Sequence, residues 1–433
     1  MSFTFSQLHP DLQQALAQLG YQQPTPIQQQ AIPEVITGAD VMAGAQTGTG
    51  KTAAFALPLL NRVLTRQSED SEAQSEESEI QTGDSKAQSE NNALQVLVLT
   101  PTRELAQQVH KSFCQYAQFT SVRIELAYGG VSLNPQLEAL ANGCEVLVAT
   151  PGRLLDLVFK RAVDLSLLQT LVFDEADRML DMGFIDEIQQ ILKRLPSKRQ
   201  TLLFSATFGD EIFKLSKQLL TEPVLIEVDA RNTAAVTVEQ KVYVVDAERK
   251  RELVSHLIGS KNWHQVLIFV KTKQGADQLA AEMCKDGLVT KAIHGDKSQG
   301  ARERVLEEFK AGTTRVLVAT DVAARGIDIP QLNTVINFDL PYIAEDYIHR
   351  IGRTGRAGQD GLAITLMSLG EEYLLEEIEV ILDERLPQQW LEGYEPDLTR
   401  EIPQNNKNSR SAQKRRAKQR AHGKSSGNRR RRK

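Results

Sequence analysis

Short apolar runs, rich in β-branched residues and each ending in a polar cluster, recur along the whole chain and constrain its fold more than any other feature. A first series contains QVLVLTPTRE, EVLVATPGR, LVFDEAD and TLLFSAT, and a second contains QVLIFVKT, KAIHGDKS, RVLVATDVAARG and TVINFDLP. Each run has the length of a buried strand, and most are followed by a helical pattern such as ELAQQVHKSFCQYAQF. Buried strands that alternate with helices predict an α/β fold with parallel sheets.

A near repeat suggests that this fold occurs twice. VLVATP begins at Val146 and VLVATD at Val316, and a chain of 433 residues is long enough for two domains, each with its own core. We expect an N-terminal domain over residues 1–228, a flexible linker over 229–237, a C-terminal domain over 238–393 and a disordered basic tail over 394–433.

Charge is distributed unevenly. Residues 403–433 hold 13 lysines and arginines and no acidic residue, which leaves 38 of the 51 basic residues against 56 acidic ones in the rest of the chain. An acidic body with a basic tail suggests a polyanionic partner. Residues 68–92 hold eight acidic residues, one lysine and almost no apolar ones, so we expect a disordered surface insertion in the first domain.

Several classes of protein are excluded by the composition. The N-terminus lacks the basic and apolar regions of a signal peptide, and no uncharged apolar stretch approaches 18 residues, so we expect neither secretion nor a membrane span. The three cysteines are far apart and fit no zinc spacing or disulfide framework. These features predict a cytoplasmic protein.

A glycine-rich stretch, AQTGTGKT, begins at Ala45, after the apolar DVMAG and before the helical AAFALPLLNRVL. This order of strand, loop and helix is typical of a phosphate-binding loop, in which Gly48 and Gly50 let backbone N–H groups turn towards phosphate oxygens. Lys51 would then reach the β- and γ-phosphates, and Thr52 would offer its hydroxyl to Mg²⁺. The strict pattern has glycine in place of Ala45, so a glycine-rich turn beside a solvated lysine stays open at this point.

Three carboxylates follow the apolar run that begins at Leu171, namely Asp174, Glu175 and Asp177. A strand that ends in carboxylates beside a phosphate-binding loop is typical of enzymes that hold Mg²⁺. Asp174 would hold the metal, and Glu175 would orient and deprotonate the attacking water. An isolated acidic cluster could instead mark only the start of a helix, but the upstream loop makes that explanation insufficient.

With both stretches in view, the sequence resembles the DEAD-box ATP-dependent RNA helicases over residues 3–394, and DRMLDMGF and IHGDKSQGAR suggest the bacterial RhlE-like branch. The resemblance implies two tandem RecA-like domains, with ATP and Mg²⁺ as cofactors. The alanine that starts the family's phosphate loop matches Ala45. GYQQPTPIQ resembles its adenine-recognition motif, so Tyr21 would stack on adenine and Thr25 and Gln28 would hydrogen-bond to it.

The resemblance also implies residues that contact RNA and residues that couple the two sites. PTRELA, the glycine pair at Gly129, TPGR, IHGDKSQGAR and ATDVAARGIDIP match RNA-facing motifs, while IFVKT matches another less distinctively. SAT would hydrogen-bond to Asp177. The implied RNA-binding residues are Pro101, Thr102, Arg103, Gly130, Thr150, Pro151, Gly152, Arg153, Gly295, Thr320 and Asp321, and the implied coupling residues are Asp177, Ser205 and Thr207.

In the second half, HRIGRTGR resembles the motif that places two arginines on the γ-phosphate from across the domain cleft. Arg353 and Arg356 lie three residues apart and would share one face of a helical turn. The implied catalytic residues are Lys51, Asp174, Glu175, Arg353 and Arg356, and the implied metal-binding residues are Thr52 and Asp174. The implied ATP-binding residues are Tyr21, Thr25, Gln28, Ala45, Gln46, Thr47, Gly48, Thr49, Gly50, Lys51, Thr52 and Asp328.

The motifs together predict an ATP-dependent RNA helicase that binds single-stranded RNA and locally unwinds short RNA duplexes. The expected partners are structured ribosomal or messenger RNA and proteins of ribonucleoprotein or RNA-degradation complexes, with no membrane involved. An ATP-dependent RNA clamp or remodeller with little unwinding carries the same motifs. A non-catalytic RNA-binding scaffold is disfavoured by the intact Lys51, Glu175, Arg353 and Arg356, and a DNA helicase only by the resemblance.

Overall fold

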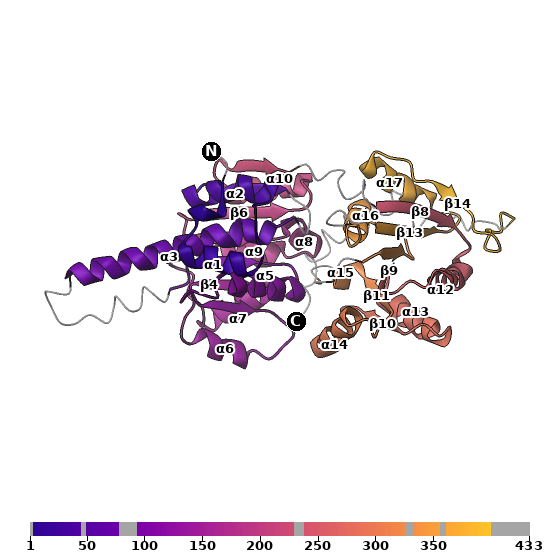
Figure 1. Cartoon of the computed structure of the whole chain (residues 1–433), viewed down its shortest axis with the longest axis horizontal. Helices are drawn as coiled ribbons and strands as arrows, with labels where there is room; N and C mark the ends of the chain where they lie inside the picture. The colour runs from indigo at the N-terminus through magenta and orange to yellow at the C-terminus, as the bar shows by residue number, and fades with distance from the viewer. Residues whose placement is uncertain are drawn as a thin grey trace, which may run out of the picture.

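The computed structural model describes residues 3–44, 49–77, 93–228, 238–324, 327, 329, 332–355 and 361–399. They form two α/β domains, each built on a seven-stranded sheet in which every pair of neighbouring strands is parallel (Figure 1). The predicted α/β class and the two tandem domains are confirmed. The predicted linker at 229–237 lies outside the described residues.

The first sheet has the strand order β3-β4-β2-β5-β6-β1-β7. In chain order its strands are β1 (Val41–Gly44), β2 (Val96–Leu99), β3 (Ile124–Ala127), β4 (Val146–Ala149), β5 (Thr170–Phe173), β6 (Gln200–Ser205) and β7 (Val224–Glu227). Its helices are η1 (Phe5–Gln7), α1 (Pro10–Gln18), α2 (Pro26–Thr37), α3 (Lys51–Glu77), α5 (Arg103–Tyr116), α6 (Asn134–Leu140), α7 (Pro151–Phe159), α8 (Ala176–Asp181), α9 (Ile185–Leu192) and α10 (Asp210–Leu219).

The second sheet repeats this order as β10-β11-β9-β12-β13-β8-β14. Its strands are β8 (Val238–Val244), β9 (Val266–Val270), β10 (Thr290–Ile293), β11 (Val316–Thr320), β12 (Thr334–Asn337), β13 (Gly361–Met367) and β14 (Gln388–Gln389). Its helices are η2 (Ala247–Arg249), α12 (Lys250–Ser260), α13 (Lys273–Lys285), α14 (Gln299–Lys310), α15 (Asp321–Ala324), α16 (Ala344–Ile351) and α17 (Glu372–Leu382). The repeated VLVA falls on β4 and β11, which occupy the same place in the two sheets.

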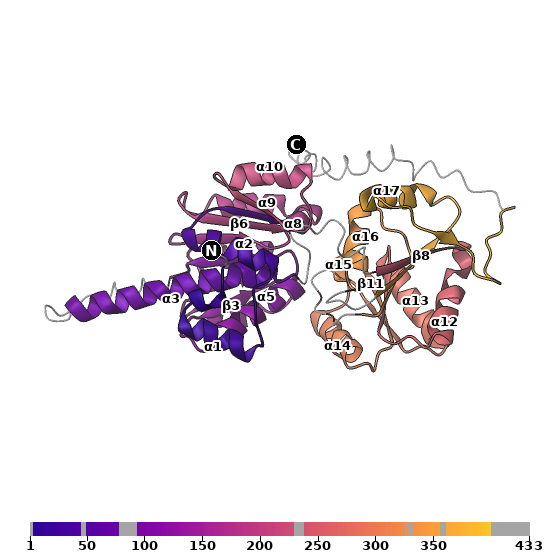
Figure 2. The ribbon, with the colours of Figure 1, turned by 45° about the horizontal axis from the view of Figure 1, so that its top comes forward.

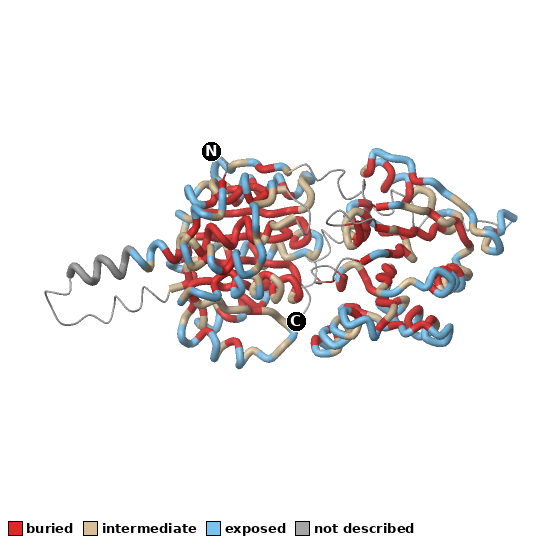
Figure 3. Tube along the Cα trace, viewed as in Figure 1, coloured by how far each residue is buried: buried red, intermediate tan, exposed pale blue. Residues whose placement is uncertain are grey.

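Helices cover both faces of each sheet because successive strand residues point to opposite sides. In β2, Val96 and Val98 pack with α1, α2, α3 and α5, whereas Leu97 and Leu99 pack with α7, α8, α9 and α10. In the second sheet α12 and α13 cover one face, and α14, α15, α16 and α17 the other. The buried segments therefore run through the middle of each domain, as Figure 3 shows.

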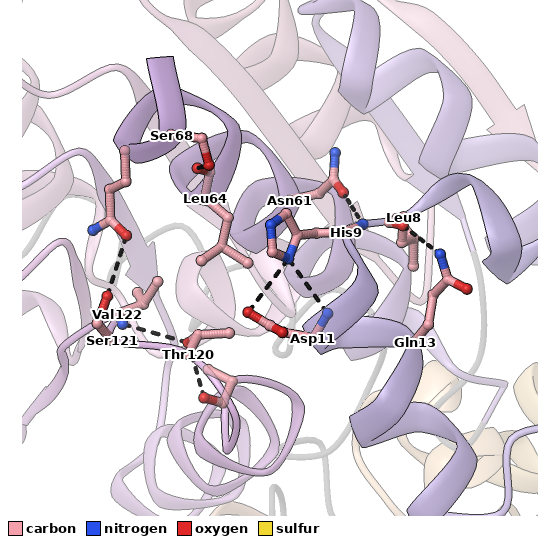
Figure 4. A network of polar contacts seen from close by, with 12 residues as sticks. Leu8, His9, Asp11, Gln13, Asn61, Leu64, Ser68, Thr120, Ser121 and Val122 are labelled. Carbon is pink, nitrogen blue, oxygen red and sulfur yellow. Dashed lines mark hydrogen bonds and ion pairs between the residues drawn. The ribbon is translucent and has the colours of Figure 1, made fainter. Parts of the chain in front are cut away.

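The N-terminal segment is fastened onto α3. The His9 backbone N–H donates to Asn61 Oδ1 over 2.7 Å, and the Gln13 side chain donates to the Leu8 carbonyl over 2.7 Å (Figure 4). Further along α3, Ser121 Oγ lies 3.5 Å from Gln67 Oε1. The His9–Asn61 bond therefore holds the start of α1 beside α3, and the Ser121–Gln67 contact joins α3 to the segment between α5 and β3.

The expected insertion begins later than the sequence suggested. α3 continues to Glu77 and projects away from the second domain (Figures 1 and 2), so the prediction of disorder is wrong for residues 68–77. Glutamate, glutamine and alanine are good helix formers, and each residue that extends an existing helix adds a hydrogen bond without needing a core. Residues 78–92 lie outside the described residues.

The second domain also ends later than predicted. Arg249 lies over the Tyr394 ring, 4.8 Å from its centroid, and His256 lies 5.6 Å from the same ring. The backbone N–H of Asp397 donates to the Asp246 carboxylate. Tyr394 packs on the domain core, so residues 394–399 belong to the domain. The remaining tail, 400–433, lies outside the described residues.

Replacement of residues 68–92 by a short glycine–serine linker should leave the thermal stability of the first domain unchanged within about 2 °C. The reason is that, among the α3 side chains that the structure describes, the last one in the core is Leu64. The measurement is thermal unfolding followed by circular dichroism. Phe113→Ala is the matched control: its ring is fully buried, and its loss should cost about 3–5 kcal/mol. A fall of more than about 5 °C in the linker variant would show that the segment supports the domain.

Candidate active site

Three polar segments meet at the carboxyl edge of the first sheet because the strands before them are parallel neighbours. β1 leads into residues 45–50, β5 leads into Asp174 and Glu175, and β6 leads into Ser205. β6 lies between β1 and β5. The end of β6 at Ser205 therefore lies between the end of β1 at Gly44 and the acidic cluster that follows β5.

Lys51 is buried at the start of α3, and within the described residues its Nζ has no hydrogen-bond partner. Burial raises the pKa of the Asp174 carboxyl to about 7, while Lys51 opposes this shift and Glu175 adds to it. A buried ammonium without a partner is costly, and phosphate oxygens would satisfy it. A divalent cation would favour the ionised form of Asp174. The donors present therefore fit a nucleotide and Mg²⁺.

Glu175 has an unusual backbone conformation. Its φ and ψ are 55° and 54°, in the left-handed region that side chains rarely adopt, at the residue before α8. Such a conformation costs about 1–3 kcal/mol and persists only where the surrounding structure enforces it. Its carboxylate is buried, and Oε2 has no hydrogen-bond partner among the described residues. The strained turn thus holds a carboxylate with an oxygen available for water.

Asp177 is tied to the neighbouring strand end. Thr207 Oγ1 donates to Asp177 Oδ2 over 3.1 Å, and Ser205 Oγ donates to the Thr207 carbonyl over 2.7 Å. Thr207 therefore makes the contact on which the predicted coupling depends, whereas Ser205 supports Thr207 and does not reach Asp177 directly.

The predicted adenine ligands surround the end of the glycine-rich loop. Gln28 is buried; its Oε1 accepts from the Thr25 backbone N–H over 3.0 Å, and its Nε2 donates to the Gly50 carbonyl over 3.1 Å. One amide hydrogen and one lone pair remain, the pair that an adenine edge needs. A Cβ at Gly50 would lie 2.3 Å from Gln28 Nε2 at a φ of +93°, so this position requires glycine.

Tyr21 is half-buried beside this site. Its ring meets Phe5 and Tyr116 edge-on with 6.0 Å between centroids, and its hydroxyl lies 2.9 Å from that of Tyr116. The aromatic contacts hold the ring at the end of α1 and α5. Thr49 and Thr52 border the same loop, whereas Ala45, Gln46, Thr47 and Gly48 lie outside the described residues.

The predicted RNA-facing residues of the first domain gather at the starts of α5 and α7. Thr102 caps α5 by accepting from the Leu105 N–H over 3.3 Å, and Pro101 precedes it. The Arg103 guanidinium packs against Gly130, where a Cβ would lie 1.9 Å from Nη1 at a φ of +81°. Arg153 donates to the Val131 carbonyl over 2.9 Å. Thr150, Pro151 and Gly152 form the first turn of α7.

The predicted RNA-facing residues of the second domain differ in their surroundings. A Cβ at Gly295 would meet only Lys273, at 3.7 Å, so the backbone there can be approached closely. Thr320 is buried at the end of β11. Asp321 accepts from both Arg350 Nε and Nη2, over 2.6 and 2.8 Å. Arg350 therefore occupies both carboxylate oxygens of Asp321, and RNA contact by Asp321 stays a prediction.

Arg353 lies in the turn after α16. The helix ends at Ile351 and Gly352 follows as its cap, so the prediction that Arg353 and Arg356 share a helical turn is wrong at Arg353. Its Nη1 donates to the Ile327 carbonyl over 3.0 Å. With Arg178 of the first domain, it lines a small cavity between the domains that Asp346, His349 and Arg350 also border. Arg356 and Asp328 lie outside the described residues.

Two buried ion pairs among the described residues join the domains, and the sequence motifs had suggested neither. Arg302 Nη2 on α14 lies 2.7 Å from Glu104 Oε1 on α5, and Arg178 Nη1 on α8 lies 3.3 Å from Asp346 Oδ1 on α16. Gln107 on α5 also donates to Glu303 on α14 over 3.2 Å. These residues fall inside or beside recognised motifs, but their partners come from the other domain, and one sequence contains no signal for such pairing.

Comparison with known proteins agrees with this geometry. The DEAD/DEAH box helicase family matches residues 25–215, and the helicase conserved C-terminal domain matches residues 249–358. The ATP-dependent RNA helicase RhlB of Pseudomonas syringae pv. tomato is 40% identical over 382 residues, which cover 88% of this chain and 92% of RhlB. The chain belongs to the DEAD-box family. The DEAD-box ATP-dependent RNA helicase CshA of Bacillus subtilis is 39% identical over 88% of the chain and 72% of CshA.

Solved structures of DEAD-box helicases share the two-domain arrangement. S. cerevisiae Dbp5 bound to RNA and ADP BeF3 is 30% identical, with a TM-score of 0.75 over 90% of this chain and 94% of Dbp5. Mss116p bound to single-stranded RNA and AMP-PNP is 26% identical, with a TM-score of 0.77 over 90% of this chain and 80% of that one. The protein is accordingly an ATP-dependent RNA helicase that uses ATP with Mg²⁺. The finer assignment to the RhlE-like branch stays a prediction.

In this DEAD-box protein, Glu175→Gln should retain ATP and RNA binding but lose turnover by about 10²–10⁴-fold. Glutamine preserves the shape and the hydrogen bonding of the side chain but cannot accept a proton. The measurement is RNA-stimulated ATPase activity beside equilibrium binding of nucleotide and RNA. Glu211→Gln, at a position exposed on α10, is the matched control. Activity within a factor of about three of the unmodified protein would remove Glu175 from the role of general base.

Proposed function

We propose that the protein binds single-stranded RNA across both domains and separates short RNA duplexes locally, with ATP hydrolysis releasing the RNA. The observation that carries this proposal is the group of buried charges at the carboxyl edge of the first sheet. Within the described part of the chain, Lys51 Nζ and Glu175 Oε2 have no hydrogen-bond partner, and Asp174 lies beside them in a site that fits phosphate and a divalent ion.

The residues of this site have separate roles in the proposed mechanism. Lys51 binds the β- and γ-phosphates, and Gln28 reads the adenine edge. Glu175 orients the attacking water and takes its proton, with the turn before α8 holding the carboxylate in place. Thr52 and Asp174 would hold Mg²⁺, which would neutralise phosphate charge when bound.

The second domain completes the site only when the domains associate. Arg353 and Arg356 provide positive charge for the γ-phosphate as negative charge develops there. Because Arg353 donates to Ile327 in the same domain, we infer that it exchanges this partner for phosphate when ATP binds. ATP and RNA both bridge the domains, so each should favour the state that the other binds.

The RNA face combines backbone and basic groups. Arg103 and Arg153 would contact phosphates, and the glycine positions Gly130 and Gly295 would let the sugar–phosphate chain approach closely. Contacts to 2′-hydroxyl groups would give a preference for RNA without a preference for sequence. We further propose a cytoplasmic location. Among the helices in the described parts of the chain, none combines the length and low charge needed to cross a membrane.

Arg353→Ala and Arg356→Ala should each lower the turnover number by about 10³-fold, with a much smaller change in ATP affinity. The guanidinium charge should matter most where charge develops in the transition state. Single-turnover hydrolysis and ATP binding are measured separately, and Arg194→Ala on the surface of the first domain is the control. If both variants lose ATP affinity but keep turnover, the arginines do not act on the γ-phosphate.

Truncation after Ile402 should weaken RNA binding and make it less dependent on salt, while ATPase activity at saturating RNA changes little. The 13 basic residues beyond this point would release counterions as they contact phosphates. A full-length variant with those lysines and arginines replaced by glutamine separates charge from length. Equal RNA affinity and equal salt dependence in all three proteins would show that the tail does not anchor RNA.

A strand-displacement assay on short RNA duplexes tests the helicase assignment itself. We expect displacement that requires ATP and declines as the duplex lengthens, because local unwinding can release only strands that pair over a short span. RNA-stimulated ATP hydrolysis without displacement would instead identify an RNA clamp or remodeller.

A further inference from the structure

The helix that follows the catalytic glutamate faces the helix that precedes Arg353. α8 lies at the side of the first domain nearest the second, and α16 faces it in both orientations (Figures 1 and 2). Arg178 on α8 and Asp346 on α16 form an ion pair across this junction, with Nη1 and Oδ1 3.3 Å apart. Their side chains are 5% and 11% exposed, so the pair is largely removed from water.

Arg178 lies on α8, three residues after Glu175. Its backbone N–H donates to the Glu175 carbonyl and to Asp177 Oδ1, both over 3.0 Å. Asp177 in turn accepts from Thr207. The Arg178 backbone is therefore held by the same turn that holds Glu175.

Asp346 lies on α16, a helix that Arg350 ties to the rest of the second domain. Arg350 lies one turn further along α16 and is fully buried. Its guanidinium donates hydrogen bonds to the Asp321 carboxylate and, over 2.6 Å, to the Asp339 carbonyl. Its guanidinium also lies over the Phe269 ring at 5.1 Å. α16 is thus fastened to the sheet, and Arg353 follows its last turn. A contact that places Asp346 also places the start of the arginine-bearing loop.

A buried ion pair adds little net stability, and in some proteins it contributes conformational specificity instead. The loss of hydration largely offsets the attraction between the charges, whereas a misplaced partner leaves a buried charge unpaired. The Arg178–Asp346 pair therefore favours one placement of α8 against α16. Any other placement would separate the two charges and leave them buried without a partner. That property suits a contact that aligns two halves of a site.

We propose that Arg178 and Asp346 are positioning residues that align Arg353 with the Glu175 segment when the domains associate. In this role the pair acts through α8, which follows Glu175, and through α16, which precedes Arg353. The inference rests on the proposed function, since alignment matters only if both segments act on one nucleotide.

The test is a double-mutant cycle with Arg178→Met, Asp346→Asn and the combined variant. Each single change should lower the turnover number at saturating RNA by about 10-fold, and the combined variant should be no slower than either one. ATP affinity without RNA should stay unchanged, whereas the increase in ATP affinity caused by RNA should shrink. Arg178→Lys, which keeps the charge, should retain more activity than Arg178→Met.

Lys214→Met and Glu211→Gln provide the matched control, because these residues form an exposed ion pair on α10. Thermal unfolding of every variant reports on folding. Multiplicative losses in the combined variant, or unchanged turnover in both single variants, would overturn the alignment role while leaving the proposed function intact. Absence of RNA-stimulated ATPase in the unmodified protein would overturn the proposed function and this inference with it.

Discussion

The placement of β6 between β1 and β5 is the constraint on which the rest of the site depends. Parallel pairing brings the ends of these strands to one edge, so Lys51, Asp174 and Glu175 lie together although more than 120 residues separate the first from the others. Charges buried in this way are costly without partners. The rigid sheet holds them in place, and a bound nucleotide with its metal would supply the missing partners.

The same sheet order also explains how nucleotide binding could affect neighbouring segments. The segment after β6 carries Thr207, which donates to Asp177, two residues after Glu175. A movement of the segment after β6 would therefore shift Asp177, and the reverse also holds, because one hydrogen bond joins them. Arg178 extends the connection to α16 in the second domain. Contacts of this kind between the two domains provide one route for coupling between ATP and RNA.

Much of this could be predicted from the sequence, because the signals are local. Apolar runs identify the strands, and the VLVA repeat at Val146 and Val316 marks equivalent strands of two domains. The motifs also locate Lys51, Asp174 and Glu175. What could not be predicted depends on tertiary context: the left-handed conformation of Glu175 and the capture of Asp321 by Arg350. The boundaries of two segments also differ from the prediction. α3 continues to Glu77 through acidic residues, which are compatible with a helix. Residues 394–399 were assigned to the tail from their composition, but Tyr394 packs on the second domain.

The central claim is that ATP and RNA stabilise one association of the two domains. Its most direct test is RNA affinity measured with and without a non-hydrolysable ATP analogue and Mg²⁺, together with analogue affinity measured with and without RNA. Linkage requires that the two affinities rise by the same factor, and we expect that factor to be about 10 or more, within the 5–150-fold range typical of coupled sites. RNA affinity that is unchanged by the analogue would contradict the claim.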